Sequence, residues 1–354
     1  MPPVIDADAA TWMARQRAQG LTDPDATDPV AVVGHLLAVQ AQDPRAMRLA
    51  IRSRSTGLTA SAADRALTDD RSLVVSWLNR GTLHLVTRED YWWLHPLTAP
   101  RQHTWNRTRL AQEGVSAEQA RRGIELVVDT VAAGPATRDQ LRAVLADGGV
   151  PTERQALVHV LIAASLDGEV VRGPLVDGHH AFAATAAWLG PRPATLDPEE
   201  ALGRLAHRYL QAHAPATPPD LAKWAGITLT QARTGFAAAG LDPNPPFPIG
   251  PPPRPTPRWP APRLLGGFDP ILHGWVDRSF VTGPHRSIVT TNGLFRPIAL
   301  VDGRAVATWR LAGGRLSIDP LEPIDEPTRS ALTEDADAVL AFLEVEPTGR
   351  AVSW

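Results

Sequence analysis

The spacing of apolar residues in the first 115 residues predicts several helices followed by a pair of strands. Apolar residues recur at Val30, Val33 and Leu36, which is the spacing of the buried face of an amphipathic helix. Two apolar runs, residues 72–78 and 83–86, flank a turn that contains glycine, as in a β-hairpin. Further helices are expected over residues 6–17, from residue 44 and after residue 61. Three helices and a hairpin are the plan of the winged helix, a variant of the helix-turn-helix.

The same order of elements recurs further along the chain. The expected elements of the two later copies are helices over 116–133, from 137, and over 152–166, a hairpin over 169–183, and helices near 198–213, 218–225 and 229–239. Repeats of one supersecondary unit favour a tandem array with a shared concave face.

The last third of the chain has a different pattern. Residues 243–262 hold eleven prolines in twenty positions, which predicts a semi-rigid extended connector. Beyond it, the Asn292-Gly293 pair lies between two strand-like runs, 287–291 and 294–298, and such a pair is a strong hairpin signal. We also expect tight turns within residues 301–305 and 311–316, and a closing helix over 327–343.

The predicted fold is α+β, mainly α, with tandem winged-helix domains (helix-turn-helix plus β-hairpin) and a β-rich C-terminal part. The expected units are a first winged-helix domain (1–115), a second (116–190), a third helical or winged-helix unit (191–242), the Pro-rich connector (243–263) and the β-rich domain with its C-terminal helix (264–354).

Composition narrows the class of protein. The 354 residues are 44% hydrophobic and 21% charged, which is ordinary for a globular protein, and no apolar run is long enough to span a membrane. The N-terminus lacks the features of a signal peptide, so a cytoplasmic, nucleoid-associated location is expected. There are no cysteines, which excludes disulfides, cysteine-ligated metals and cysteine nucleophiles. No His-x-x-x-His motif occurs, and neither a metal nor a cofactor is expected.

Charge is distributed unevenly although the net charge is only −3. The segments 45–109 and 254–315 each carry a net charge of +6, and the segment 319–346 has nine acidic residues and one arginine. Such a distribution suits a protein that binds a polyanion on one surface, and ordinary surface charge would give it as well.

Two neutral amides stand two residues apart in Gln40-Ala41-Gln42-Asp43-Pro44. Pro44 disfavours helical conformation at Asp43, so a helix should end before it. Asp43 is then expected to be the N-cap, and Pro44 the first residue, of the next helix. Gln40 and Gln42 would lie on a helix end and the bend after it, where both can face one pocket. The alternative is that they are solvated polar residues.

Three blocks of this sequence resemble one known family. They are Gln40-Ala41-Gln42-Asp43 with Arg80-Gly81-Thr82-Leu83-His84-Leu85-Val86; Arg208-Tyr209-Leu210 with Pro215-Ala216-Thr217 and residues 220–226; and residues 264–269 with Asp277-Arg278, residues 292–297 and residues 301–304. Together they resemble the AlkZ-like winged-helix DNA glycosylases. The resemblance spans nearly the whole chain and keeps the order of the blocks.

The resemblance implies a C-shaped monomer that excises N7-alkylated guanines from double-stranded DNA, including bulky natural-product adducts and interstrand crosslinks. In that family a Gln-x-Gln motif is catalytic in the branch that unhooks crosslinks, and a Gln-x-Asp motif marks another branch. By this resemblance, the family's catalytic Gln-x-Gln motif corresponds to Gln40 and Gln42. The family's DNA-facing hairpin corresponds best to the strands around Asn292-Gly293.

Two glutamines are sufficient for this reaction because an N7-alkylguanine is cationic and leaves without protonation. What remains is to place a water and to stabilise an oxocarbenium-like sugar, and a glutamine amide can both accept from and donate to that water. We expect Gln42 to hold the water and Gln40 to fix it or the sugar, with the reverse assignment open. Asp43 can add a negative charge, beside its expected capping role.

Arginines near both segments are candidates for phosphate contacts, which position a duplex without reading its sequence. The candidate DNA-binding residues are Arg45, Arg48, Arg52, Arg286, Asn292 and Arg296; the alternative is that the arginines are solvated surface residues. A bulky adduct does not fit a snug base pocket, so an open cleft is expected.

Lysine usage bears on the type of glycosylase. Lys223 is the only lysine and lies far in sequence from the glutamines, whereas a glycosylase with lyase activity normally uses an amine. A monofunctional enzyme is therefore expected, with the secondary amine of Pro2, exposed if Met1 is removed, as an alternative.

Two alternative hypotheses assign the protein no catalytic activity. One is a winged-helix regulator, which would typically dimerise on palindromic half-sites, although no coiled-coil heptads occur here. The other is a resistance protein that sequesters a genotoxic compound. The sequence does not name the lesion, nor does it separate narrow self-resistance from broad repair.

Overall fold

The protein is described from a computed structural model over residues 7–176, 179–241, 259–346 and 350–354. Its helices are α1 (Ala7–Ala18), α2 (Pro29–Leu36), α3 (Pro44–Arg52), α4 (Ala60–Thr68), α5 (Arg88–Gln112), α6 (Ala117–Ala132), α7 (Arg138–Asp147), α8 (Ala156–Leu166), α9 (Thr185–Leu189), α10 (Pro198–His213), α11 (Pro218–Ala225), α12 (Leu229–Ala238), α13 (Ser279–Thr282) and α14 (Glu326–Phe342). Short 3₁₀ turns are η1 (Asn79–Gly81), η2 (Pro270–Leu272) and η3 (Arg286–Ile288).

The strands form two five-stranded sheets. They are β1 (Val39–Gln40), β2 (Leu73–Trp77), β3 (Leu83–Thr87), β4 (Val170–Val176) and β5 (His179–Ala184) in the first sheet, and β6 (Arg263–Leu265), β7 (Ile298–Val301), β8 (Arg304–Ala312), β9 (Arg315–Pro320) and β10 (Ala351–Ser353) in the second.

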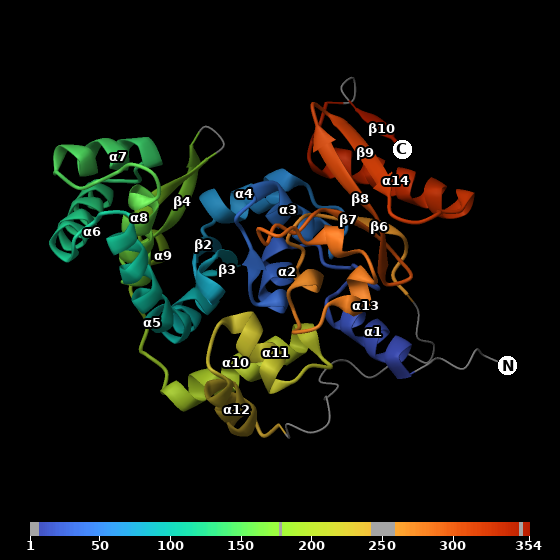
Figure 1. Cartoon of the computed structure of the whole chain (residues 1–354), viewed down its shortest axis with the longest axis horizontal. Coiled ribbons are helices and arrows are strands. Elements are labelled where there is room, and N and C mark those ends of the chain that lie inside the picture. The colour runs from blue at the N-terminus through green and yellow to red at the C-terminus, as the bar shows by residue number, and fades with distance from the viewer. Residues whose placement is uncertain (1–6, 177–178, 242–258, 347–349) are drawn as a thin grey trace.

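The first sheet joins the two predicted hairpins into one surface. Its strand order is β1-β3-β2-β4-β5, and the hairpins meet where Val75 of β2 pairs with Arg172 of β4. The β2–β3 hairpin follows helices α1 to α4, and the β4–β5 hairpin follows α6, α7 and α8, so helices precede each hairpin as the sequence predicts. In Figure 1 the helices α6, α7 and α8 lie at the left of this sheet, and α2, α3 and α4 lie near the centre. The winged-helix assignment and the domain boundaries stay predictions.

The largest apolar core connects parts of the chain that the sequence treats as separate units. Tyr91 and Trp93 of α5 belong to the same buried cluster as Tyr209 of α10 and Trp224 of α11. Buried aromatic side chains of this size remove a large apolar area from water. The helices α10, α11 and α12, at the bottom of Figure 1, are therefore packed onto the N-terminal part through shared aromatic side chains.

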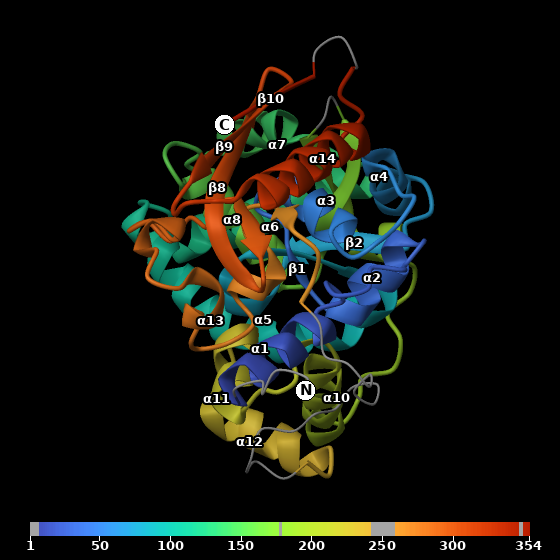
Figure 2. The ribbon, with the colours of Figure 1, turned by 90° about the vertical axis from the view of Figure 1, so that its right-hand side faces the viewer.

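The second sheet has the order β10-β9-β8-β7-β6, with β10 parallel to β9. Its two tight turns agree with the sequence. Asp302 and Gly303 have φ values of +46° and +77°, and Gly313 and Gly314 have +54° and +76°, as two-residue hairpin turns require. Helix α14 lies beside this sheet in Figures 1 and 2, and its apolar residues share a core with those of β8 and β9.

The hairpin strands predicted around Asn292-Gly293 are not formed. One isolated bridge joins Val289 to Phe295, and the expected first strand begins instead as η3 (Arg286–Ile288). The Gly293 N–H donates to the Thr290 carbonyl at 2.9 Å, and Gly293 has φ of +74°. Gly293 therefore follows the two central residues of a wider turn, which is another use of a left-handed glycine. The result is an exposed loop closed at its base.

Most of the predicted Pro-rich connector lies outside the described residues. Within those residues, no helix is both long enough and apolar enough to span a membrane.

Candidate active site

Between α2 and α3 the chain is extended through β1 (Val39–Gln40) and then bends at Gln42. Leu37, with φ of +66°, ends α2, and Gln40 pairs with His84 of β3. The prediction that Gln40 lies at a helix end is wrong, because β3 holds this backbone: the Ala41 N–H donates to a β3 carbonyl at 2.8 Å. In extended chain, residues i and i+2 point to the same face. The two glutamines therefore lie on one side of the segment.

The start of α3 agrees with the sequence. Asp43 is the N-cap, and its carboxylate accepts hydrogen bonds from the backbone N–H groups of Arg45 and Ala46 at 2.8 and 3.2 Å. Pro44 occupies the first helical position. The cap fixes the bend at Gln42, so local sequence determines where this side chain leaves the backbone.

The two glutamine side chains form a directed hydrogen-bond chain with Arg80. An Arg80 Nη2 lies 3.4 Å from Gln40 Oε1, and Gln40 Nε2 donates to Gln42 Oε1 at 2.6 Å. Because arginine can only donate, Gln40 must present its oxygen to Arg80 and its NH₂ group to Gln42. Gln40 is 8% exposed and Gln42 is exposed. Gln42 is thus the member of the pair that can meet a substrate.

Arg80 lies in the turn between β2 and β3 and is held by backbone groups. Its φ is +57°, and its guanidinium donates to the Trp224 carbonyl of α11. Gly226 permits this approach: a Cβ at Gly226 would lie 2.8 Å from the Arg80 amide nitrogen. Burial, and the positive charge of Arg278, lower the pKa of Arg80 to about 10. Among the described residues, no carboxylate forms an ion pair with Arg80.

A cavity of about 380 Å³ opens beside the glutamine pair. We call it the glutamine pocket, formed by Gln40, Gln42, Arg80, Lys223, Arg278 and residues 292–295, with an aromatic wall. Its walls come from five separate parts of the chain: β1 and the bend after it, η1 with Thr82, α11, residues 268–278, and residues 292–295, which we call the C-terminal loop. The C-terminal loop carries Asn292, so the segment predicted to face DNA borders the predicted catalytic pair.

The aromatic wall of the glutamine pocket contains Phe268, His273 and Phe295. The His273 and Phe295 rings meet edge to face with centroids 4.3 Å apart, and the Arg278 guanidinium lies 5.0 Å from the Phe295 ring centre. Burial, followed by the positive charge of Arg80, lowers the pKa of His273 to about 3. This wall therefore carries a neutral imidazole at physiological pH.

A second, larger hollow of about 610 Å³ also has Gln42 in its lining. We call it the arginine hollow, formed by Gln42, Pro44, Arg138, Arg172 and His180 among others. The Arg172 guanidinium lies 4.2 Å from the Phe182 ring centre, and burial together with Arg138 lowers its pKa to about 10. Gln42 thus lines two open, cationic spaces.

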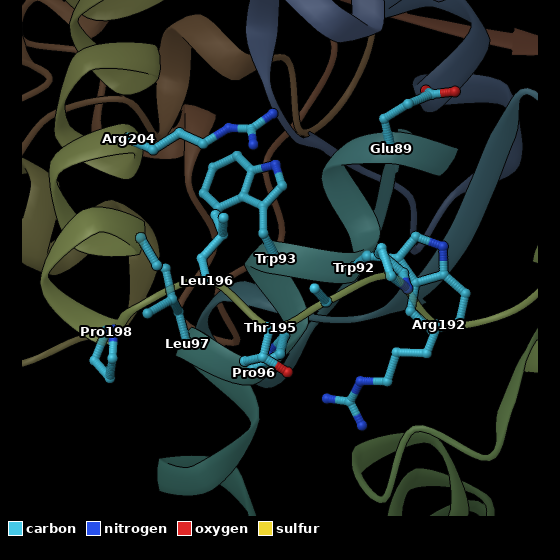
Figure 3. A pocket seen from close by; sticks show the side chains of 13 residues that line it. Glu89, Trp92, Trp93, Pro96, Leu97, Arg192, Thr195, Leu196, Pro198 and Arg204 are labelled. Atoms are coloured by element: carbon cyan, nitrogen blue, oxygen red, sulfur yellow. The ribbon is translucent and has the colours of Figure 1, made fainter.

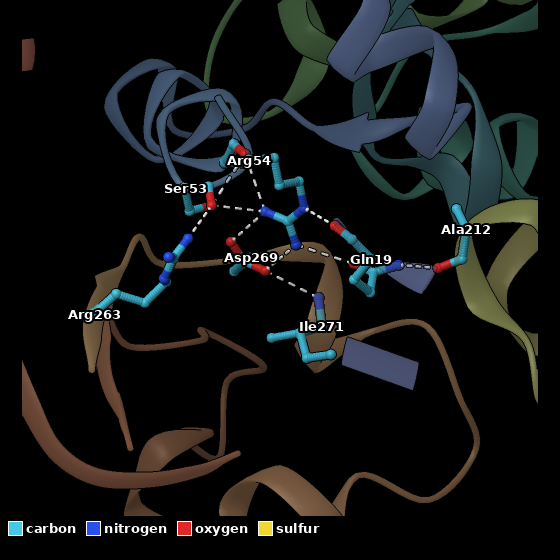
Figure 4. A network of polar contacts seen from close by, with 8 residues as sticks. Gln19, Ser53, Arg54, Ala212, Arg263, Asp269 and Ile271 are labelled. Atoms are coloured by element: carbon cyan, nitrogen blue, oxygen red, sulfur yellow. Dashed lines mark hydrogen bonds and ion pairs between the residues drawn. The ribbon is translucent and has the colours of Figure 1, made fainter. Parts of the chain in front are cut away.

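A buried ion pair between Arg54, just after α3, and Asp269 fixes the aromatic wall of the glutamine pocket to the N-terminal part of the chain (Figure 4). Arg54 donates to both carboxylate oxygens of Asp269, at 2.8 and 3.0 Å, and the two side chains are 2% and 0% exposed. Arg54 also donates to the Gln19 carbonyl at 2.8 Å. Because Asp269 follows Phe268 directly, this contact sets the position of the aromatic wall.

The predicted DNA-binding residues fall into two groups. Asn292 lines the glutamine pocket, and Arg286 and Arg296 are exposed around the same loop. Arg45 is also exposed, and donates to the Leu311 carbonyl at 3.0 Å. These four side chains are accessible to a ligand, and their contact with DNA stays a prediction.

Arg48 and Arg52 are engaged inside the protein. Arg48 pairs with Asp64 at 2.7 Å. Arg52 donates to both oxygens of the Asp335 carboxylate, at 2.5 and 2.9 Å, and so ties α3 to α14. Their side chains are only 15% and 12% exposed. A phosphate would have to share these guanidinium groups with a carboxylate, so they are weaker candidates than the exposed arginines.

Lys223 lines the glutamine pocket together with Gln40 and Gln42. The expectation that distance along the chain separates this amine from the glutamines is wrong, because α11 packs against η1 through Arg80. Arg80 and Arg278 also line the glutamine pocket and were not among the predicted site residues. Arg80 carried a signal, since it precedes Gly81 in a turn inside one of the resembling blocks, but its contact with Gln40 depends on the folded chain.

Another cavity, of about 280 Å³, lies between α5 and α10 and has an apolar lining (Figure 3). Trp92, Trp93 and Leu196 line it, and Arg204 covers Trp93 with 4.8 Å between the guanidinium and the ring centre. It contains none of the predicted site residues. Trp92 and Trp93 therefore serve packing, as is usual for an aromatic stripe on a helix.

Known proteins resemble this chain over most of its length. The chain matches the sequence profile of the family described as "DNA glycosylase AlkZ-like" over residues 33–342. A curated relative, the "Interstrand DNA cross-link repair glycosylase" of Streptomyces sahachiroi, is 27% identical over an alignment of 374 positions. This alignment covers 92% of each protein. The solved structure of Streptomyces sahachiroi DNA glycosylase AlkZ superposes with a TM-score of 0.79 at 24% identity, covering 99% of this chain and 100% of that one.

Proposed function

Because the chain belongs to the AlkZ-like DNA glycosylase family, we propose that it hydrolyses the N-glycosidic bond of N7-alkylated guanine in duplex DNA. The observation that carries this proposal is the Arg80–Gln40–Gln42 chain of hydrogen bonds beside the glutamine pocket. It presents one exposed amide, that of Gln42, on a rigid support. This is what a reaction needs when water has to be positioned and the leaving group is already cationic.

The proposed roles follow from the direction of these hydrogen bonds. Gln40 is a positioning residue, since its oxygen is turned to Arg80 and its NH₂ group to Gln42. Gln42 keeps its own NH₂ group and the second lone pair of Oε1 for the attacking water. The water oxygen bonds to C1′, the C1′–N9 electron pair neutralises the cationic base, and the released proton passes to solvent. Base removal is thus hydrolysis that needs no amine, and it leaves an abasic site.

The shape of the site supports a bulky substrate. Gln42 lines both the glutamine pocket and the arginine hollow, and both are open on the surface. A base that carries a large adduct has no need to enter an enclosed pocket here, as it must in glycosylases that extrude the base. The relative named for interstrand crosslink repair supports extending the substrate class to crosslinked guanines, in repair or self-resistance.

The proposed partner is double-stranded DNA, bound by one copy of the chain. Arg80, Arg278 and Arg172 face the two hollows without a carboxylate partner among the described residues. Cationic groups of this kind attract phosphates. Since all the residues of the pocket come from one chain, a monomer is sufficient, and its place of action would be the nucleoid.

The test is release of the free base from a duplex with one N7-methylguanine, followed by chromatography, and from a duplex crosslinked through two N7 positions. We expect modified guanine in solution, an alkali-labile site in the strand, and conversion of the crosslinked duplex to separable strands. A matched duplex with unmodified guanine is the control. If the protein binds these duplexes and releases no base, the regulator hypothesis replaces this proposal.

A further inference from the structure

Lys223 is the only lysine of the protein, and it lines the glutamine pocket. The hydrolysis proposed above does not use this group. An amine that lines the same pocket as the proposed catalytic pair has a chemical use, because the abasic product of base removal carries an aldehyde in its ring-opened form.

The position of Lys223 is well defined. Its Nζ donates to the Val276 carbonyl at 3.0 Å, and the Val276 N–H in turn donates to Asp220 of α11 at 2.8 Å. Asp220 also accepts a hydrogen bond from the Thr217 N–H at 2.9 Å, at the start of the helix. The loop at Val276 and α11 are thereby fixed to one another. Lys223 is exposed, so two of its three N–H groups remain for a ligand.

The charges around Lys223 favour a reactive amine. Partial burial and the positive charge of Arg278 lower the pKa of Lys223, and Arg80 acts in the same direction, against Asp220 and Asp277. A lysine beside other cationic groups holds more of its amine neutral at a given pH, which is a known route to Schiff-base formation.

We propose that Lys223 captures the abasic site by forming a Schiff base with its C1′ aldehyde and then promotes strand cleavage. The supply of abasic sites by this enzyme rests on the function proposed above. Nζ attacks C1′, and loss of one water gives an iminium. Loss of a C2′ proton to solvent then expels the 3′ phosphate, with the electron pair of the C3′–O bond going to the phosphate. Water finally hydrolyses the iminium and returns Lys223 to its free form.

This step is separate from base removal. Water takes the place of the base in the first step, and the amine acts only on the product. The enzyme would therefore leave an alkali-labile site early in a reaction and a cleaved strand later. Such a sequence would keep the abasic site bound until it is processed, and would explain why an amine accompanies the glutamines.

The experiment uses a duplex with a preformed abasic site, so that glycosylase activity is not needed. The full-length protein is incubated with it in the presence of cyanoborohydride, which reduces the iminium to a stable covalent adduct. We expect an adduct with the wild-type protein, located by mass spectrometry on the peptide that contains Lys223. Both Lys223→Arg and Lys223→Ala should lower its yield by more than about tenfold.

Lys223→Arg is the matched control because it keeps the positive charge. Its affinity for the abasic duplex should stay within about threefold of wild type, and its melting temperature should be unchanged, since Lys223 is exposed. If wild type gives no adduct, or if the adduct persists in Lys223→Arg, the proposal is overturned. An adduct on the N-terminal peptide would assign the amine to Pro2, which lies outside the described residues. Base release from N7-methylguanine without any adduct would overturn this proposal and leave the hydrolytic function intact.

Discussion

Two arginines in this protein are removed from water in different ways. Arg54 has its guanidinium on both oxygens of Asp269, so a buried positive charge is matched by a buried negative charge. Arg80 is held by the Trp224 carbonyl and by Gln40, and among the described residues no carboxylate pairs with it. In the Arg54–Asp269 pair the two charges neutralise each other. Arg80 instead leaves a positive potential in the glutamine pocket.

The difference suggests a structural role for the Arg54–Asp269 pair and a ligand-binding role for Arg80. A buried ion pair holds two parts of the chain together, but its field outside is small because the charges cancel. An uncompensated cation costs stability, and such a cost is typical of a site that waits for a ligand. Arg80 contacts Gln40, and we propose that its charge also attracts the phosphates of DNA.

The largest expected effect comes from breaking the balanced pair. Asp269→Ala would leave the Arg54 charge buried without a partner, and we expect the free energy of unfolding to fall by about 3–5 kcal/mol. Denaturant titration measures it. The control is Asp319→Ala, which removes the partner of Arg310 from an exposed pair and should cost less than about 1 kcal/mol. Equal losses in the two variants would contradict the structural role given to Asp269.

Acid should destabilise the region around Arg80. His273 has a pKa of about 3 in the folded state, from burial and from Arg80, against an ordinary value of 6.5. A histidine with a lowered folded pKa contributes stability above its unfolded pKa and loses it as the pH falls toward the folded value. Between pH 7.5 and pH 5 this histidine alone should cost about 2 kcal/mol. Urea titrations of the wild type and of His273→Gln at both values measure it, because His84, His95, His180 and His213 also have lowered pKa values and add to the loss in both proteins. An equal loss in the two proteins would refute the shift.

A smaller effect should follow from removing the uncompensated cation. Arg80→Met deletes the donor to Gln40, and we expect the single-turnover excision rate to fall by about tenfold. The free energy of unfolding should stay level or rise, because a buried charge without a partner is lost. This result would be the opposite of that for Asp269→Ala. Arg80→Gln keeps a hydrogen-bond donor without the charge, and full activity in it would show that the hydrogen bond to Gln40 matters and the charge does not.

The smallest effect concerns the rim of the pocket. Arg296→Ala should weaken DNA binding only a few-fold and lower the slope of log affinity against log salt by about 0.9, the value for one phosphate contact. Arg121→Ala is the control, since Arg121 lies on α6 and pairs with Glu125 on the same helix. An unchanged salt slope in Arg296→Ala would remove Arg296 from the DNA-binding surface.

Local rules predicted much of the fold. The cap at Asp43, the first turn at Pro44 and the hairpin turn at Asp302-Gly303 depend on neighbouring residues, and all three are present. The strand conformation of Gln40 depends on β3, which is distant in sequence, so a pattern of nearby residues could not reveal it. The Asn292-Gly293 pair gave the opposite error, because a strong local turn signal does not by itself supply strands that pair on both sides.

Only part of the candidate site could be predicted, because local patterns are visible in the sequence and long-range contacts are not. Gln40 and Gln42 are neighbours in sequence and carry their own signal. Lys223 and Arg80 join them only because α11 packs against the β2–β3 turn. Distance along the chain therefore misled us about Lys223, whose place in the pocket comes from tertiary packing.

The most direct test of the central claim is the single-turnover excision rate of Gln42→Ala on a duplex with one N7-methylguanine, measured together with its affinity for that duplex. If Gln42 holds the water and makes no essential contact with bound DNA, the rate should be lower by about 10²-fold or more, with affinity within about threefold of wild type. A rate close to that of wild type would contradict the assignment of the reaction to this pair.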